Sequence, residues 1–100
     1  MAQLDIYKGQ GGGAAFLLNL QDDMLGDLTT RVVAPLVSPE KVGPPMQRVN
    51  PRILVQGEEY ILLTHLLAAI PAQTLADPIG SASHQRDTVI AALDMLFTGI

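Results

Sequence analysis

Residues 83 to 100 have the periodicity of one amphipathic helix, and that helix limits how the rest of the chain can pack. At about 100° per residue, a set of apolar side chains falls within one arc, as a buried stripe requires. The stripe consists of Val89, Ile90, Leu93, Leu96, Phe97 and Ile100, and the opposite side of Asp87, Ala91, Asp94, Met95 and Thr98. The hydroxyls of Ser81 and Ser83 can cap the first amides. Gly99 most easily takes the left-handed conformation that ends a helix. We therefore predict a single helix from Ser83 to Ile100.

The segments before this helix have the features of short β-strands. Polar and apolar residues alternate, or short β-branched runs occur, between Gly and Pro residues. The predicted strands are Gln3 to Tyr7, Ala14 to Gln21, Thr30 to Val37, Arg52 to Val55, Glu59 to Leu63 and Leu66 to Ile70. Pro35 lacks a backbone donor, which predicts an edge or a bulge in its strand. Strands followed by one C-terminal α-helix predict a mainly β fold, a compact antiparallel barrel or sheet packed on that helix.

Two loops in the first third of the chain have unusual compositions. Gly9 to Gly13 consists almost entirely of glycine. It lacks the Lys-Ser/Thr ending of a phosphate-binding loop, so we predict a flexible hairpin tip. Asp22 to Asp27 is polar but carries Met24 and Leu25 in its middle. Two interpretations of that pair remain open, an apolar plug that closes the barrel end or a contact surface.

Composition predicts one domain, residues 1 to 100, that associates with a second copy. Apolar residues make up 48% of the 100-residue chain and charged residues only 16%. One small core cannot easily enclose so much apolar surface, so we expect a homodimer. The net charge of −4 argues against direct nucleic-acid binding, which normally requires a clustered basic face. Residues 1 to 10 do not resemble a signal peptide, and the uncharged stretch 61 to 76 is too short to span a membrane. We expect a cytoplasmic protein without membrane contact.

The sequence offers little that could support catalysis. There is no cysteine, and therefore no thiolate nucleophile and no cysteine-based metal site. Nothing in the spacing joins His65 or His84 to a nucleophile or a carboxylate, so we expect structural roles for both. The adjacent acidic pairs at 22–23 and 58–59 have diverging side chains on extended backbone and do not form a dyad. We expect no enzymatic activity, no cofactor and no metal.

Several segments, taken in order along almost the whole chain, resemble the CcdB toxins. They are Gln3-Leu4-Asp5-Ile6-Tyr7, Asn19-Leu20-Gln21-Asp22-Asp23-Met24-Leu25, Arg31-Val32-Val33-Ala34-Pro35-Leu36, Gly57-Glu58-Glu59-Tyr60, Ala69-Ile70-Pro71, Ser83-His84 and Phe97-Thr98-Gly99-Ile100. The resemblance implies an SH3-like barrel (CcdB/MazF-like) with a C-terminal helix, forming a homodimer. It also implies a toxin without enzymatic activity that binds the DNA gyrase A subunit and traps the cleaved gyrase–DNA complex. A CcdA-type antitoxin would neutralise the toxin and repress the operon together with it. The toxin would meet DNA only through the antitoxin or gyrase.

The resemblance also implies two sets of binding residues. The gyrase-binding set is Met24, Leu25, Asp94, Phe97, Thr98, Gly99 and Ile100. The antitoxin-binding set is Gly9, Gln10, Gly11, Gly12, Gly13, Lys41 and Arg48. The chain departs from the family pattern at two of these positions. Thr98 stands where the pattern has a tryptophan, and Asp94 stands where it has an amide.

Three functions therefore remain open for this chain. The first is a dimeric gyrase poison. The second is a CcdB-like protein that has lost or weakened poisoning and acts as an antitoxin-binding co-repressor, because Thr98 cannot replace the contact area of a tryptophan. The third is an endoribonuclease of the MazF-like type, which the acidic composition makes the weakest of the three.

Overall fold

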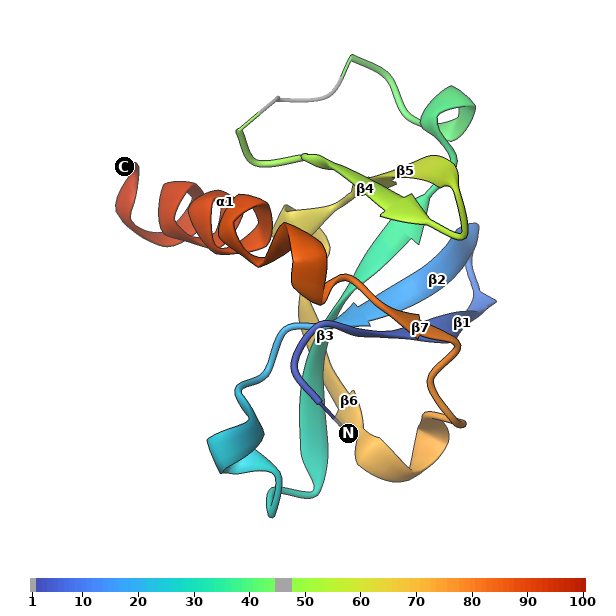
Figure 1. Ribbon diagram of the computed structural model, residues 1–100, viewed down its shortest axis with the longest axis vertical. Coiled ribbons are helices and arrows are strands. Elements are labelled where there is room, and N and C mark those ends of the chain that lie inside the picture. The colour runs from blue at the N-terminus through green and yellow to red at the C-terminus, as the bar shows by residue number, and fades with distance from the viewer. Residues whose placement is uncertain (1, 45–47) are drawn as a thin grey trace.

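The chain forms a curled antiparallel sheet with one long helix against its side (Figure 1). The computed structural model describes residues 2–44 and 48–100. The strands are β1 (Asp5–Gly11), β2 (Ala14–Asn19), β3 (Thr30–Val37), β4 (Arg52–Val55), β5 (Glu58–Leu62), β6 (Ala68–Pro71) and β7 (Gly80–Ser81). The helix α1 spans Arg86–Thr98, and the 3-10 turns are η1 (Asp23–Leu25), η2 (Pro39–Lys41), η3 (Thr64–Leu66), η4 (Ala72–Thr74) and η5 (Ser83–Gln85).

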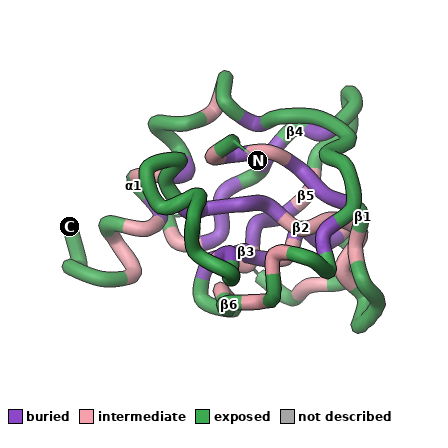
Figure 2. Tube along the Cα trace, turned by 90° about the horizontal axis from the view of Figure 1, so that it is seen from below, coloured by how far each residue is buried: buried purple, intermediate pink, exposed green. Residues whose placement is uncertain are grey.

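The sheet is a nearly closed barrel of the SH3-like class, so the predicted fold is confirmed. The strand order is β4-β5-β3-β2-β1-β7, with β6 also paired to β3. Figure 2 shows the buried residues concentrated where the strands line the interior of the barrel. The main core cluster is formed by Leu4, Ile6, Leu18, Leu20, Ala34, Leu36, Ile53, Val55, Leu62, Ala82 and Val89.

β3 is the central strand, and its predicted boundaries match the structure. The expectation that Pro35 marks an edge or a bulge is wrong. Pro35 pairs with Leu17 of β2 on one side. On its other side β6 pairs with residues 30–33 of β3 and β5 with residues 36–37, so Pro35 lies between these two partner strands. A residue at that junction has no strand partner to donate to, so the missing N–H has no cost there. The Pro35 carbonyl still accepts a hydrogen bond from the Leu63 amide at 2.9 Å.

The glycine run is only partly a hairpin tip, which corrects the prediction. β1 extends to Gly11, so the run's first residues belong to a strand and the turn consists of Gly12 and Gly13. The register shifts between Lys8 and Gly11, as in a β-bulge. Gly11, Gly12 and Gly13 have φ of 98°, 69° and 86°, a region that favours glycine. Backbone geometry therefore accounts for the composition of this run.

The β4–β5 hairpin is confirmed, with β5 beginning and ending one residue earlier than predicted. Gln56 and Gly57 have φ of 53° and 84°, as a two-residue type I′ turn requires. The outer edge of β4 is closed by the side chain of Gln85. Its Oε1 accepts from the Leu54 amide at 2.8 Å, and its Nε2 donates to the Arg52 carbonyl at 3.2 Å. This amide therefore attaches the start of the helix to the edge of the barrel.

Other boundaries differ from the prediction because of short local turns. β1 begins at Asp5 rather than Gln3, and β2 ends at Asn19 rather than Gln21. The predicted strand at 66–70 is divided between η3 and β6. The predicted loop at 72–81 contains η4 and β7.

The helix is shorter than predicted at both ends, because α1 spans Arg86–Thr98 rather than Ser83 to Ile100. Ser83 lies in η5, where its amide donates to the Ser81 hydroxyl at 3.1 Å, and α1 begins only at Arg86. Gly99 is left-handed, with φ of 77°, and its amide bonds to the Met95 carbonyl at 3.1 Å. The serine therefore supports the turn before the helix, and the glycine ends the helix as expected.

Tyr7 forms a second, smaller core cluster with Val33 and Leu75. Tyr7 is 1% exposed, and its hydroxyl has no hydrogen-bond partner among the described residues. Burial, aided by the nearby Asp5, raises the pKa of Tyr7 above its ordinary value of 10.0. The site favours the neutral phenol over the charged phenolate. Burying the unpaired hydroxyl therefore costs desolvation free energy, and alkali, which removes its proton, should destabilise the fold.

We expect Tyr7→Phe to leave the free energy of unfolding unchanged or to raise it by about 1 kcal/mol, because the buried hydroxyl is unpaired. In the unaltered chain the raised pKa means that the unfolded state loses the Tyr7 proton first. Stability should therefore fall as the pH rises above about 10, and Tyr7→Phe should flatten this decline. Denaturant titrations between pH 7 and 11 measure both effects. If Tyr7→Phe lowered the free energy of unfolding by more than about 1 kcal/mol at pH 7, the prediction would be wrong, because the Tyr7 hydroxyl would then have to make a hydrogen bond.

Candidate functional site

The last turns of α1 extend away from the barrel. Val89 and Ala92 are buried against the sheet, and Leu93 packs at the edge of the core. Beyond them Phe97 is 70% exposed and Ile100 is 84% exposed. The prediction that Phe97 and Ile100 lie in a buried stripe is therefore wrong. Figure 2 shows the reason, since the C-terminal end of the helix runs out past the body of the protein and has no sheet beneath it.

The polar side of the helix end is exposed as predicted. Asp94 and Thr98 lie one turn apart on this side, and Gly99 is also exposed. The Thr98 hydroxyl donates to the Asp94 backbone carbonyl at 2.7 Å. Met95, which was expected on this side, is half-buried. The helix end therefore presents a carboxylate and a short hydroxyl beside two large apolar side chains.

The loop after β2 presents a second set of exposed apolar side chains. Met24 is 91% exposed, while Leu25 and Leu28 are each 51% exposed. The interpretation of Met24 and Leu25 as a plug in the barrel end is therefore wrong. Leu28 was not identified from the sequence, although an apolar residue between Asp27 and Thr29, outside any strand, was a usable signal.

The structure does not bring the two parts of the predicted gyrase-binding set together within one protomer. Figure 1 shows η1, which carries Met24 and Leu25, and the end of α1 at separate corners on one side of the molecule. Phe97 and Ile100 lie at the helix corner. The loop and the helix end are therefore two separate exposed apolar elements.

The predicted antitoxin-binding set is divided in the same way. The glycine tip lies across the molecule from the end of the helix (Figure 1). There the Gln10 side chain donates to the Thr74 carbonyl at 2.8 Å. Lys41 is exposed in η2. Arg48, by contrast, lies at the helix end, where its Nη2 donates to the Ile100 carbonyl at 3.1 Å. One residue of the antitoxin set therefore touches a residue of the gyrase set.

A cleft of about 730 Å³ runs between α1 and the segment before β4. Its walls are Val42, Gly43, Pro44, Val49, Asn50, Ile61, Leu63, His65, Met95 and Leu96. Nδ2 of Asn50 lies 3.2 Å from Nδ1 of His65 and donates to the Leu62 carbonyl at 3.2 Å. The expected structural role of His65 agrees with this contact. Sequence reasoning did not predict the cleft, because its sides come from distant segments.

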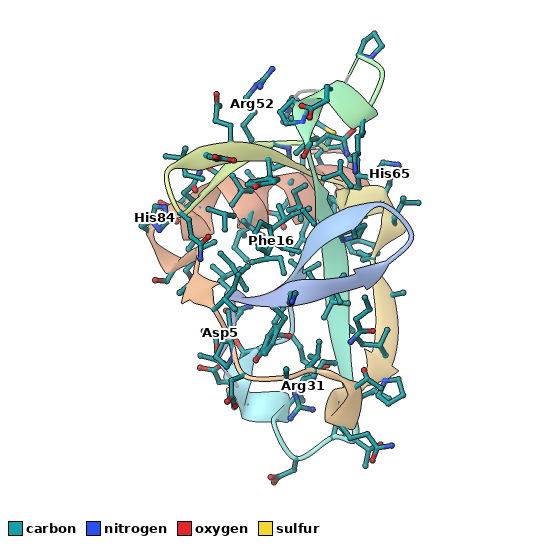
Figure 3. All side chains as sticks on the ribbon, turned by 90° about the vertical axis from the view of Figure 1, so that its right-hand side faces the viewer. Asp5, Phe16, Arg31, Arg52, His65 and His84 are labelled. Carbon is teal, nitrogen blue, oxygen red and sulfur yellow. The ribbon has the colours of Figure 1, made fainter. Side chains whose placement is uncertain are left out.

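The two histidines, His65 and His84, are both exposed. Figure 3 shows His65 and His84 on opposite sides of the molecule, so they do not share a site. Within the part of the chain that the structure describes, no three His, Cys, Asp or Glu side chains are grouped to hold a metal ion. Among residues 2–44 and 48–100, no helix combines the length and apolar character needed to cross a membrane.

The chain also matches the model of a known protein family. The model of the family described as CcdB protein matches residues 3–99. The matched region includes all the strands, the loop that carries Met24 and the helix up to Gly99. The match therefore includes the loop with Met24 and the exposed end of α1, except for Ile100.

Proposed function

The chain belongs to the CcdB family, the toxins of the CcdA/CcdB toxin–antitoxin systems, and on this premise we propose that it is a dimeric poison of DNA gyrase. It binds the gyrase A subunit through the end of α1 and the loop that carries Met24 and Leu25, and it stabilises the cleaved gyrase–DNA complex. A CcdA-type antitoxin neutralises it in the cytoplasm and represses the operon together with it. It meets DNA only through these partners, and a single domain performs these roles.

The observation that carries the proposal is the exposure of Phe97, at 70%, on the last turn of a helix ended by Gly99. Leaving such a side chain in water forfeits about 1.5 to 3 kcal/mol of burial free energy, which a partner can recover. A two-fold axis would present two such helix ends to a two-fold target. The exposed Met24 and Leu25 would provide a second contact on the same side of each protomer.

A second function, co-repression without poisoning, is favoured by one specific feature. The helix end has Thr98, and its hydroxyl is already bonded to the Asp94 carbonyl at 2.7 Å. A threonine offers much less contact area to a target than the tryptophan of the family pattern. Asp94 can compensate in part by pairing with an arginine of gyrase through a charge-assisted hydrogen bond.

A gyrase cleavage assay with the purified protein separates the candidate functions when it is run beside an RNA degradation assay. We expect linear, gyrase-cleaved DNA to accumulate and RNA to remain intact. Antitoxin binding without DNA cleavage would replace the proposal with the co-repressor function. RNA degradation would indicate the endoribonuclease instead, which the net charge of −4 disfavours.

We expect Thr98→Trp to increase affinity for the gyrase A subunit by about tenfold or more, because an indole adds contact area at the centre of the proposed interface. Thr98 is exposed, so the larger side chain meets no barrier in the free protein. Isothermal titration with a gyrase A fragment measures the change, and Thr88→Trp, at an exposed position near the start of the same helix, is the matched control. Equal affinities for Thr98→Trp and the unaltered chain would argue against contact at the helix end.

A further inference from the structure

A buried arginine holds the loop between β2 and β3, here called the 22–29 loop. Arg31 follows this loop in β3 and is only 9% exposed. Its Nη1 donates to the carbonyls of Leu28 at 2.5 Å and Thr30 at 2.8 Å, and its Nη2 donates to the Gly26 carbonyl at 2.6 Å. Figure 3 shows the Arg31 side chain at the end of the barrel beside this loop. One guanidinium therefore fixes three points of the backbone.

Arginine suits this position because of its shape and its permanent charge. Its planar group carries five N–H donors in a rigid fork, whereas lysine has one ammonium on a flexible stem. A buried cation must be hydrogen-bonded, and backbone carbonyl groups outside the strand pairing need other donors. Arg31 meets both requirements at once. Any movement of Gly26 or Leu28 away from it would leave a buried charge with fewer partners.

Two further side chains hold the same loop from its other end. Gln21 is 8% exposed, and its Nε2 donates to the Leu25 carbonyl at 3.0 Å while its Oε1 accepts from the Val32 amide at 3.1 Å. The Asp22 carboxylate accepts from the Met24 amide at 2.8 Å. Gln21 therefore links the Leu25 carbonyl to the Val32 amide of β3, and Asp22 fixes the Met24 amide within the loop.

This combination of a fixed backbone with exposed apolar side chains is the notable property of the 22–29 loop. Met24 is 91% exposed, and Leu25 and Leu28 are 51% exposed. A flexible loop would lose conformational entropy when a partner ordered it, and a loop already held in place avoids that loss. The buried polar groups thus keep the apolar side chains ready for contact.

We propose that Arg31 is a positioning residue for target binding: it holds the 22–29 loop so that Met24 and Leu25 contact the partner without prior ordering. The inference rests on the proposed function, in which that partner is the gyrase A subunit. Arg31 is buried and does not itself touch the target, so its effect on binding passes through the loop.

The test is a double-mutant cycle in the full chain. Arg31→Lys keeps the charge but loses the fork, and we expect about tenfold weaker binding to a gyrase A fragment. In a background that already carries Met24→Ala and Leu25→Ala, Arg31→Lys should weaken binding less than about twofold, because the contacts it positions are gone. Arg52→Lys, at an exposed arginine of β4, is the matched control and should leave binding unchanged.

Hydrogen exchange provides the readout that does not depend on binding. In the unaltered chain the amides of Leu25, Gly26 and Leu28, all hydrogen-bonded within the loop, should be protected, and Arg31→Lys should speed their exchange about tenfold. Unprotected amides in the unaltered chain would overturn the role of Arg31, even if Arg31→Lys did not fold. Equal losses of binding in both backgrounds, or no loss, would also overturn it. Absence of gyrase binding by the unaltered chain would instead overturn the proposed function.

Discussion

Replacing Phe97 with alanine is expected to weaken binding to the gyrase A subunit by about 30- to 1,000-fold, the equivalent of about 2 to 4 kcal/mol for an aromatic residue at an interface centre. The fold should not be affected. Phe97 is 70% exposed in the free protein, and alanine is a better helix former than phenylalanine. The free energy of unfolding should therefore change by less than about 0.5 kcal/mol. Isothermal titration and denaturant unfolding on the same preparation measure both quantities.

The matched control is Leu54→Ala, which removes an apolar side chain that is 47% exposed on β4. Leu54 lies outside both proposed contact elements, so this variant should bind gyrase A like the unaltered chain. Equal binding by Phe97→Ala and Leu54→Ala would show that exposure alone does not identify the contact surface. A large loss of stability in Phe97→Ala would show that the side chain is covered in solution, for example by a second copy.

Replacing Gly9 with alanine is expected to lower the free energy of unfolding by about 2 to 3 kcal/mol. A Cβ atom at this position would lie 2.1 Å from the Ala14 carbonyl oxygen, in the facing strand of the β1–β2 hairpin. Since that contact is with backbone, a side-chain rotation cannot relieve it, and the bulge must open. The melting temperature should fall by roughly 10 to 20 °C for a chain of this size.

Gly80→Ala is the control for the Gly9 prediction. Gly80 also lies in a strand, but a Cβ there would meet no atom within 4 Å. Its effect should stay within about 0.5 kcal/mol. Similar melting temperatures for Gly9→Ala and Gly80→Ala would mean that the hairpin accommodates the methyl group. The comparison also bears on the antitoxin, because Gly9 belongs to the set of residues predicted to bind it. A loss of antitoxin binding in Gly9→Ala must be corrected for unfolding.

The parts of the fold that follow from local patterns were predictable from the sequence. The β-branched run Thr30 to Val37 forms β3 within its predicted boundaries, and Gln56-Gly57 forms the turn of the β4–β5 hairpin. The environment of Pro35 was not predictable. Whether a proline lies at an edge or between two successive partners depends on which distant strands pair with it.

The exposure of the candidate contact residues was predicted in part, and the errors have separate physical causes. The periodicity of the helix correctly indicates which side faces the barrel, but it does not indicate where the barrel ends. Val89 is therefore buried, whereas Phe97 on the same stripe is exposed. The family resemblance implied that Met24 and Leu25 are contact residues, whereas the composition of their loop alone left burial and contact open. Arg31 was not recognised as the anchor of the 22–29 loop, because its partners are backbone carbonyls, which leave no signal in the sequence.

We propose that this chain binds gyrase through the end of α1 and the 22–29 loop. Hydrogen–deuterium exchange of the complex with a gyrase A fragment tests that claim most directly. Slower exchange is expected at the amides of residues 22–28 and 94–100, with no change in the glycine tip at 12–13. A stable complex whose protection lay only in the glycine tip or on the outer face of β4, with the helix end still exchanging freely, would contradict it.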